Sequence, residues 1–491
     1  MVELIPLFIL GIYIAFLLYS GYIGFKRTKA GRLEFFVASG TLGVVATFFT
    51  YVATWYSAYS FLGYPAIFYT WGAEWNIIDT FTYPFVIVAL TFIIAHRVWS
   101  LAKKYKYITP TDLVVHRTGI NIPMRILFLI MVVYPYIFYM GIQFIAMSVI
   151  ASGIAGIPYH SALFLFAVIA VIVIALGGIR GVAYSDILMG GTFIGMMTVV
   201  LILLPQYLGG FEYIEKAIEN PKTAWIFQPT LPPQYFITYF ILSSLPWAGL
   251  VPHLMTKLYA AKSDKAIYAS AVGIGIGAFL LVTVSPLLVG SALAYYWPEP
   301  PKVTVREEYV TIFFSQLISP TIAMILMLGL VAAAFSTILG IAITLTSMIH
   351  VDILEKTLKL KLSERTLDLI ARLLVILIMA VGIYSAINPA HPIVRIGITI
   401  IWPGLSVVGL PILLALFWER INRWGVFLGL ISGFVTLILF QYFIWPDWPN
   451  NPFYFWEGTL PVIIGIVVTV AVSYITSPEP KERLKDFFPY S

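Results

Sequence analysis

The chain has 491 residues, of which 60% are hydrophobic and 11% are charged, with a formal net charge of +6 and a mean hydropathy of +0.94. Because a soluble globular domain carries about 25% charged residues, this composition excludes a soluble protein and predicts one polytopic membrane domain over 1–491. The lack of cysteine excludes disulfides, thiolate nucleophiles and cysteine-ligated metals.

Long apolar runs predict about thirteen transmembrane helices. They cover 5–24, 43–69, 75–98, 124–152, 160–178, 183–206, 236–257, 266–294, 318–350, 366–388, 395–418, 424–446 and 457–477. The acidic start MVELIPLF and the long first run indicate a retained helix rather than a cleaved signal peptide. An outer N-terminus puts 24 of the 29 lysines and arginines on the cytoplasmic side. The charge bias therefore predicts a cell-membrane protein with its N-terminus outside and its C-terminus in the cytoplasm.

The second apolar run, 43–69, has a small and polar centre. Ala53, Thr54 and Ser57 lie in its middle, and Pro65 follows. Proline lacks an amide donor and displaces the carbonyl four residues earlier, so we expect this helix to be interrupted. Backbone carbonyls freed at membrane depth are tolerated only where they face protein, water or an ion. The alternative is a face of small residues that serves helix packing alone.

The ninth apolar run contains Leu330–Leu354, which carries five hydroxyl side chains. Two of them, Ser336 and Thr337, are adjacent and lie one turn after the small residue Ala333. Two hydroxyl oxygens, together with carbonyls from a broken neighbouring helix, would form a cage for a small hard cation. Equally, serine and threonine can bond back to the carbonyl one turn earlier and only join helices.

Among the charged residues within or at the ends of predicted spans, Asp186, Glu74, Asp79 and Lys257 are of most interest. Asp186, near the cytoplasmic end of the sixth span, could receive a cation or cap a helix, because a buried charge must be paired or solvated. Glu74 and Asp79 lie at the outer end of the third span. There they could attract cations, bond a polar substrate or, for Glu74 above all, remain solvated. Lys257 ends the seventh span beside the cytoplasm, and we expect it to snorkel into water.

Aromatic side chains inside the spans have two interpretations. Tyr56, Tyr59, Tyr136, Tyr139 and Trp247 either pack between helices or line a pocket near the membrane midplane. The chain contains no Walker loop, G-x-S-x-G or H-E-x-x-H motif, and its six histidines form no metal-ligand spacing. We therefore expect neither an enzyme nor an ATP-driven pump.

Six segments, in order along nearly the whole chain, carry further motifs. They are RLEFFVASGTLG, KYITPTDLVVHRTG, GGIRGVAYSDILMGG, PHLMTKLYAAKSDKAI, AAAFSTILGIAITLTSMIHVDIL and IWPGLSVVGLPILLALFWERINRWGVFLGLISG. On these motifs the chain resembles the solute:sodium symporter family. The resemblance implies an all-α, leucine-transporter-like fold. A first helix at 5–24 would precede two inverted five-helix repeats at 43–206 and 236–418, and two extra helices would fill 424–477.

The resemblance also implies a sodium site. Its ligands would be the carbonyls of Ala53, Tyr56 and Ala333 and the hydroxyls of Ser336 and Thr337. Sodium would be a co-transported ion, with no other cofactor expected, and Asp186 would meet the ion as it leaves. The positions that match the family's substrate pocket include Ser57, Glu74, Tyr139 and Ser244, with Trp247 nearby.

The segment TWYSAYSFLGYPAIFYTWG most resembles the monocarboxylate-permease branch, and the chain departs from proline-type members at Gly40, Trp55 and Met189. We therefore expect a sodium-coupled symporter that imports a small organic solute, foremost a monocarboxylate, by alternating access. The alternatives are an amino-acid symporter of the proline type, a pantothenate symporter or, in another class, an uncoupled facilitator or channel. The expected partners are the solute, sodium and the lipid bilayer, without nucleic acid.

Overall fold

A computed structural model of the protein describes residues 4–28, 31–229, 232–299, 308–317, 320–389, 391–444 and 455–488. Within these ranges the chain is helical, and its one β-type contact is an isolated bridge between Leu42 and Ala261. The first half contains α1 Leu4–Arg27, α2 Arg32–Val37, η1 Ala38–Gly40, α3 Val44–Trp55, η2 Tyr59–Gly63, α4 Tyr64–Trp71, α5 Glu74–Phe81, η3 Thr82–Ile87, α6 Val88–Tyr105, α7 Pro110–Thr118, α8 Ile122–Ala155, α9 Tyr159–Tyr207, α10 Glu212–Glu219 and η4 Ala224–Phe227.

The second half continues with shorter helical segments joined by wide or tight turns. It contains α11 Pro233–Ser244, η5 Leu245–Ala248, α12 Pro252–Ala260, α13 Asp264–Ala278, η6 Phe279–Val284, α14 Ser285–Tyr296, α15 Glu308–Leu317, α16 Pro320–Ser347, η7 Met348–Thr357, α17 Glu364–Ile387, α18 Ile393–Ile396, η8 Gly397–Ile401, α19 Trp402–Phe417, α20 Arg423–Leu439, η9 Phe440–Ile444, α21 Thr459–Ile475 and α22 Lys481–Leu484.

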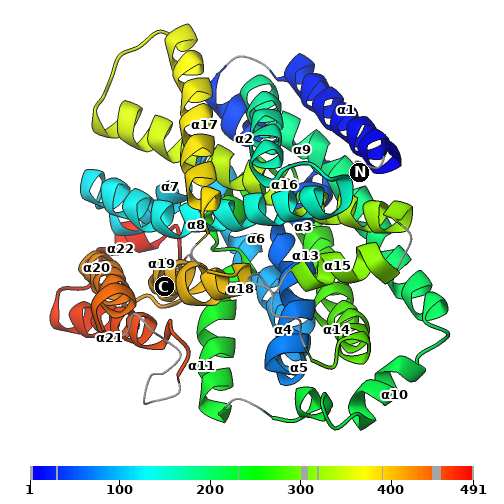
Figure 1. The fold of residues 1–491 in the computed structure, drawn as a ribbon. Helices are drawn as coiled ribbons and strands as arrows, with labels where there is room; N and C mark the ends of the chain where they lie inside the picture. Colours follow the sequence, from blue (N-terminus) through cyan, green and yellow to red (C-terminus); the bar gives the residue numbers. More distant parts are fainter. Residues whose placement is uncertain are drawn as a thin grey trace.

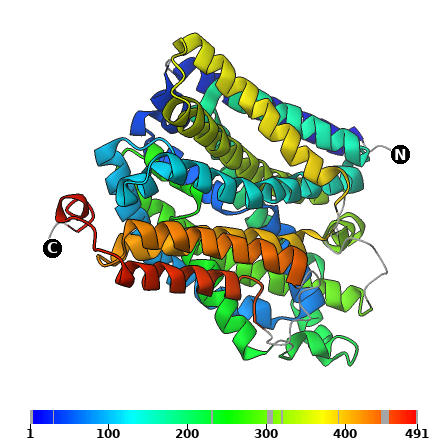
Figure 2. The same cartoon turned by 90° about the vertical axis from the view of Figure 1, so that its left-hand side faces the viewer.

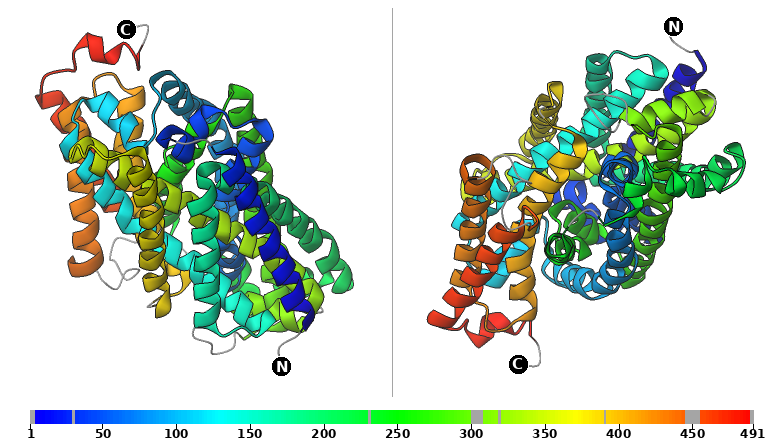
Figure 3. Two further views of the ribbon diagram at one scale, coloured as in Figure 1. Left: turned by 90° about the horizontal axis from the view of Figure 1, so that it is seen from above. Right: turned by 60° about the horizontal axis from the view of Figure 1, so that its bottom comes forward.

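The helices form one bundle with α16 at its centre. Helix α1 lies on one flank against α9, and the antiparallel pair α20 and α21 lies on the opposite flank (Figures 1 and 2). The apolar stretch of α16 and η7 is wholly buried, whereas α1 and α20 expose most of their apolar surface, as lipid-facing helices do. Helix α1 begins at the end of the bundle opposite to α22, as an odd number of crossings requires (Figure 3).

Within the described part of the chain, ten helices are long and apolar enough to cross a membrane. Helix α9 covers two of the expected spans, 160–178 and 183–206, because it bends at Gly178, where φ is +51°. A Cβ at Gly178 would lie 2.7 Å from the Phe35 carbonyl oxygen, so glycine is required both for the bend and for the close approach. Two further expected spans correspond to the interrupted helix α3–η2–α4 and to α21, which has 17 residues. The total of thirteen stays a prediction.

Two membrane helices are discontinuous, and the first is the run that Pro65 is expected to interrupt. Helix α3 ends at Trp55, and the chain resumes in a wide π-helical turn, η2, directly before Pro65. Helix α11 ends at Ser244, passes through the turn η5 and resumes as α12. Interruptions of this kind place backbone polar groups at membrane depth, where they can bind ions or substrate.

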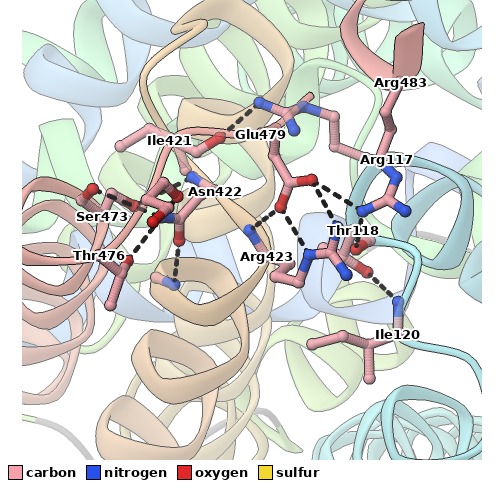
Figure 4. A network of polar contacts seen from close by, with 12 residues as sticks. Arg117, Thr118, Ile120, Ile421, Asn422, Arg423, Ser473, Thr476, Glu479 and Arg483 are labelled. Carbon is pink, nitrogen blue, oxygen red and sulfur yellow. Dashed lines mark hydrogen bonds and ion pairs between the residues drawn. The ribbon is translucent and has the colours of Figure 1, made fainter. Parts of the chain in front are cut away.

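A polar network joins the C-terminal segment to the lysine- and arginine-rich end of the bundle (Figure 4). Glu479 accepts hydrogen bonds from the Arg423 guanidinium at 2.9 and 3.0 Å and from Arg483 at 2.7 Å. Arg483 also donates to the carbonyl of Thr118 in α7, and Arg117 donates to the carbonyl of Ile421 at 2.6 Å. The segment after α21 is therefore fastened to both α7 and α20.

A second ionic network closes the same end of the bundle between α7, α8 and η7. Arg125 pairs with Asp112 at 3.1 Å and also with Asp352, while Lys356 pairs with Asp112 at 2.5 Å. Burial by itself raises the pKa of Asp112, but the charges of Lys356 and Arg125 bring that pKa below its ordinary value. Folding therefore favours the ionised form of Asp112, and the ion pairs hold the three segments together.

Candidate functional site

The break after α3 leaves backbone carbonyls without their helical partners. Tyr56 has extended backbone angles of φ −90° and ψ 140°. In an unbroken helix the amide of Ser57 would donate to Ala53, but here it faces the Ser60 hydroxyl at 3.4 Å. The Ser60 amide likewise donates to Ser57 rather than to the Tyr56 carbonyl. The carbonyls of Ala53 and Tyr56 are therefore available for other ligands.

Helix α16 supplies hydroxyl groups directly opposite this break. The hydroxyl of Thr337 lies 3.3 Å from the Tyr56 carbonyl oxygen and 3.1 Å from the Ala333 carbonyl oxygen. The hydroxyl of Ser336 lies 2.9 Å from that of Thr54 in α3. The side chains of Ser336 and Thr337 are completely buried. The two halves of the expected cation cage thus meet across the interface between α3 and α16.

These oxygens suit a small alkali cation. Three neutral carbonyls and two hydroxyls present lone pairs without a protein charge, and hard cations prefer oxygen ligands. In the described residues no group of three or more histidine, aspartate or glutamate side chains could hold a metal. Because none of these five ligands is a carboxylate, a monovalent ion fits them better than a divalent ion, which normally needs carboxylate ligands.

Gln143 of α8 stabilises the far side of the break. Its side-chain oxygen accepts a hydrogen bond of 2.9 Å from the Ala58 amide, and its side-chain nitrogen donates to the Tyr139 carbonyl. Gln143 is completely buried. Sequence reasoning missed this residue because its partner is an amide that only the folded interruption exposes.

A small polar and aromatic pocket adjoins the break. Its walls are Trp55, Ser57, Tyr59, Ser60, Tyr64, Tyr83, Tyr139, Trp247 and Trp402. The aromatic rings meet edge to face, for example Trp247 with Trp402 at 5.2 Å between centroids. The enclosed volume is about 20 Å³, which admits about one water molecule. A solute can enter only if these side chains move.

Three of the five expected substrate residues, Ser57, Tyr139 and Trp247, line this pocket. Ser244 is buried at the end of α11, beside Tyr83. Glu74 starts α5 and is partly exposed; it is not among the residues that line the pocket. A larger cavity of about 310 Å³ lies elsewhere, against Phe25, Arg32 and Arg372.

Asp79 is buried behind the pocket. Its side chain is 2% exposed and lies beside Tyr64 and Tyr83, two of the pocket walls. No lysine, arginine or histidine forms an ion pair with Asp79 among the residues that the structure describes. A buried carboxylate without a cationic partner is costly, so Asp79 is a candidate for binding a positively charged group of a ligand.

Asp186 and Lys257 form a buried ion pair close to the expected cation cage around Ser336 and Thr337. Their shared partner Thr50 lies one turn of α3 before Thr54, which contacts Ser336. The Lys257 ammonium lies 3.1 Å from the Asp186 carboxylate and 2.8 Å from the Thr50 hydroxyl, and Thr50 also donates to Asp186. Both charged side chains are completely buried. The expectation that Lys257 snorkels into water is therefore wrong, because the lysine turns inward toward the one carboxylate that compensates its charge.

The sequence matches a known family over most of its length. The profile of the "Sodium:solute symporter family" covers residues 35–433. The chain is 26% identical over 438 residues to the sodium/pantothenate symporter of Haemophilus influenzae, with 87% of this chain and 88% of that protein covered. It is 24% identical over 484 residues to the high-affinity proline transporter PutP of Bacillus subtilis, with 96% and 98% covered.

Solved structures show the same fold. The substrate-bound, outward-open state of a Na⁺-coupled sialic acid symporter has a TM-score of 0.79 at 18% identity, covering 97% of this chain and 99% of that chain. Mhp1, a nucleobase-cation-symport-1 family transporter in a closed conformation, has a TM-score of 0.53 at 14% identity, with 95% and 97% covered. The expected all-α transporter fold is confirmed, and the chain belongs to the sodium:solute symporter family, whose members are transporters rather than enzymes.

Proposed function

We propose that the protein imports a small zwitterionic amino acid together with sodium by alternating access. The single observation that carries the sodium part is the meeting of Thr337 with the freed carbonyl of Tyr56 at 3.3 Å. An ion at this place would bind Ala53, Tyr56, Ala333, Ser336 and Thr337 at once. It would thereby hold the broken α3 segment against α16 and order the adjoining pocket.

The proposed substrate differs from the monocarboxylate that the sequence favours. The relatives named above are a sodium/pantothenate symporter and a proline transporter, which fit the alternatives of that expectation better than its main reading. Proline and pantothenate share a carboxylate, but only proline also carries a cation. The buried carboxylate of Asp79 beside the pocket favours a solute with a positive charge, because it would complete an ion pair there.

Ser57 and the helical segment that resumes at Tyr59 would bind the carboxylate end of such a solute. Helical segments that start at membrane depth direct amide groups toward anionic parts of a substrate. The amide of Tyr59 lies 3.2 Å from the Ser57 hydroxyl, which fixes that side chain at the pocket wall. We propose that the substrate carboxylate binds near Ser57 and that its ammonium group points toward Asp79.

In this proposal the two inverted repeats, 43–206 and 236–418, rock about the occupied site. The N-terminus lies outside and the C-terminus in the cytoplasm, as the lysine and arginine distribution predicts. The ion then leaves toward the cytoplasm past Asp186. One positive charge that crosses about 100 mV gains about 2.3 kcal/mol, which drives roughly 50-fold accumulation of a neutral zwitterion, at about 1.4 kcal/mol per tenfold.

Uptake by proteoliposomes tests this proposal. Proline and other neutral amino acids, pantothenate and short monocarboxylates are each offered with an inward gradient of sodium or of choline. We expect sodium-dependent accumulation of an amino acid and, for Asp79→Asn, an apparent affinity at least about tenfold lower, as expected for losing a charged hydrogen bond. Glu74→Gln is the matched control because Glu74 is partly exposed at the start of α5, whereas Asp79 is buried against the pocket walls Tyr64 and Tyr83.

Other outcomes would contradict parts of the proposal. Pantothenate or lactate accumulation that is unchanged in Asp79→Asn would exclude the zwitterion and keep sodium coupling. Uptake that ignores sodium and never exceeds equilibrium would instead identify a facilitator.

A further inference from the structure

The ammonium group of Lys257 occupies a cation position of its own beside the hydroxyl cage. It lies 2.8 Å from the Thr50 oxygen and 3.1 Å from Asp186 Oδ2. Three elements, α3, α9 and α12, contribute one side chain each to this position. It therefore has a carboxylate and a hydroxyl oxygen, which are ligands that hard cations use.

This position shares its walls with the cage around Ser336 and Thr337. Thr50 precedes Thr54 by one turn of α3, and Thr54 contacts Ser336 at 2.9 Å. On the facing helix, Gly340 follows Ser336 by one turn. A Cβ at Gly340 would lie 2.7 Å from a carbon of Thr54 and 3.6 Å from Cε of Lys257. The absence of a side chain at Gly340 thus makes room for both, and the two cation positions are one helical turn apart.

The buried carboxylate of Asp186 is stabilised by a cation beside it. An isolated charge in a low-dielectric interior costs several kcal/mol or more, so the ionised form of Asp186 requires a partner. One of its oxygens, Oδ2, receives both Lys257 and Thr50, while Oδ1 has no hydrogen-bond partner among the described residues. The carboxylate therefore retains the capacity to accept a cation ligand in addition to the bonds at Oδ2.

We infer that Lys257 serves as a tethered cation that stands in for a second sodium ion, so that this protein binds a single sodium in the cage next to it. Removing the ammonium group while retaining Asp186 converts its position into a sodium site formed by Asp186 and Thr50. The inference rests on the proposed sodium cage and adds the stoichiometry. It assigns Lys257 as the residue that sets the number of coupled ions.

Lys257→Met is the informative substitution. The methionine side chain matches the lysine stem as far as Cε and leaves the place of the ammonium group open. Lys257→Met with Asp186→Asn removes both charges and needs no ion. Lys103→Met is the matched control, since Lys103 lies at the exposed end of α6 and bonds a backbone carbonyl at 2.8 Å.

Equilibrium binding of ²²Na⁺ to the purified full-length chain gives the stoichiometry. The wild type and Lys103→Met should bind about one ion per chain, Lys257→Met about two, and the double variant about one again. The melting temperature of Lys257→Met should rise more steeply with sodium concentration than that of the wild type, because each added binding site stabilises the folded state.

Three outcomes distinguish a failure of the sodium cage from a failure of the role assigned to Lys257. A wild type that binds no sodium contradicts the cage itself. About one ion bound by both the wild type and Lys257→Met overturns the assignment of Lys257 and leaves the cage intact. A Lys257→Met protein that fails to fold in saturating sodium, while the double variant folds, also overturns it, because sodium would then be unable to replace the ammonium group.

Discussion

The hydroxyl of Thr337 lies 3.3 Å from the carbonyl oxygen of Tyr56, although 281 residues separate them. This contact joins α16 to the point where α3 breaks, and it adjoins a pocket whose walls include Ser57 from the same break. Ion binding at this contact and solute binding in the pocket therefore depend on the same few residues of backbone, which gives a physical route for coupling.

Thr337→Ala should weaken activation of transport by sodium. The substitution removes one ion ligand, and we expect the half-activating sodium concentration to rise by about tenfold or more, as for loss of one charge-assisted contact. Sodium titration of uptake, normalised to protein abundance, measures this. Thr436→Ala is the control, because Thr436 only bonds back to Ser432 in the lipid-exposed helix α20. Equal titrations for Thr337→Ala and the control would be incompatible with the cage.

Gln143→Leu should impair the break itself. Leucine fills similar space but leaves the buried amide of Ala58 without its acceptor, at a cost of about 1–3 kcal/mol. We expect a lower melting temperature, and we expect the binding of sodium and the binding of solute both to weaken. The reason is that the interruption after α3 contributes to both the sodium cage and the pocket. Gln234→Leu, at an exposed position of α11, serves as the control. A variant with lower stability but unchanged binding of both ligands would limit Gln143 to a structural role.

Arg125→Gln should open the lysine- and arginine-rich end of the bundle. Without Arg125, the carboxylates of Asp112 and Asp352 lose a shared cation, and repulsion between them favours separation of α7 from η7. The chain has no cysteine, so a single Thr256→Cys reporter, buried near that end, can be labelled cleanly. We expect the labelling rate to increase by about tenfold or more, as for loss of a buried ion pair.

The control for this measurement is Arg365→Gln, which removes an exposed arginine at the start of α17. Its labelling rate should match that of the parent reporter. If Arg125→Gln leaves the reporter as protected as in the parent, the ionic network does not act as a closure between these segments.

Glu479 should make stability depend on pH. Burial acts to raise the pKa of Glu479, but hydrogen bonds from Arg423, with the charge of Arg483, bring it below its ordinary value of 4.5. Folding therefore favours the ionised form. Its contribution to stability is complete above about pH 4.5 and is lost as the pH falls through the lower folded-state pKa.

The melting temperature of Glu479→Gln, measured between about pH 3 and pH 7, tests this. The deficit relative to the wild type should be largest near neutral pH and should shrink in the acid range. Glu482→Gln, an exposed neighbour in α22, should show no such deficit. A deficit of Glu479→Gln that persists unchanged at the lowest pH would contradict the role of its charge.

Much of the fold could be predicted from local residue chemistry. Pro65 predicts the discontinuous helix α3–η2–α4, because proline weakens a helix interior wherever it lies. The adjacent hydroxyls of Ser336 and Thr337 are likewise visible in the sequence, and the structure brings Thr337 to Tyr56. The bend at Gly178 is different, since its cause is the approach of Phe35 from a distant helix.

The site could be predicted only in part. Lys257 near a span end resembles a snorkelling lysine, and only the packing of α12 against α3 and α16 reveals that its ammonium points inward to Asp186. Gln143 lies in an apolar helix and gives no local indication of its partner. Glu74 matches the family's pocket position, yet the structure brings the aromatic residues Tyr64 and Tyr83 to the pocket wall instead.

Equilibrium ²²Na⁺ binding tests the sodium cage most sharply when the purified wild type is compared with the double variant Ser336→Ala, Thr337→Ala. We expect saturable binding of about one ion to the wild type, and at least about tenfold weaker binding to the double variant, as for loss of two oxygen ligands. Identical binding isotherms for two equally folded proteins would contradict the cage.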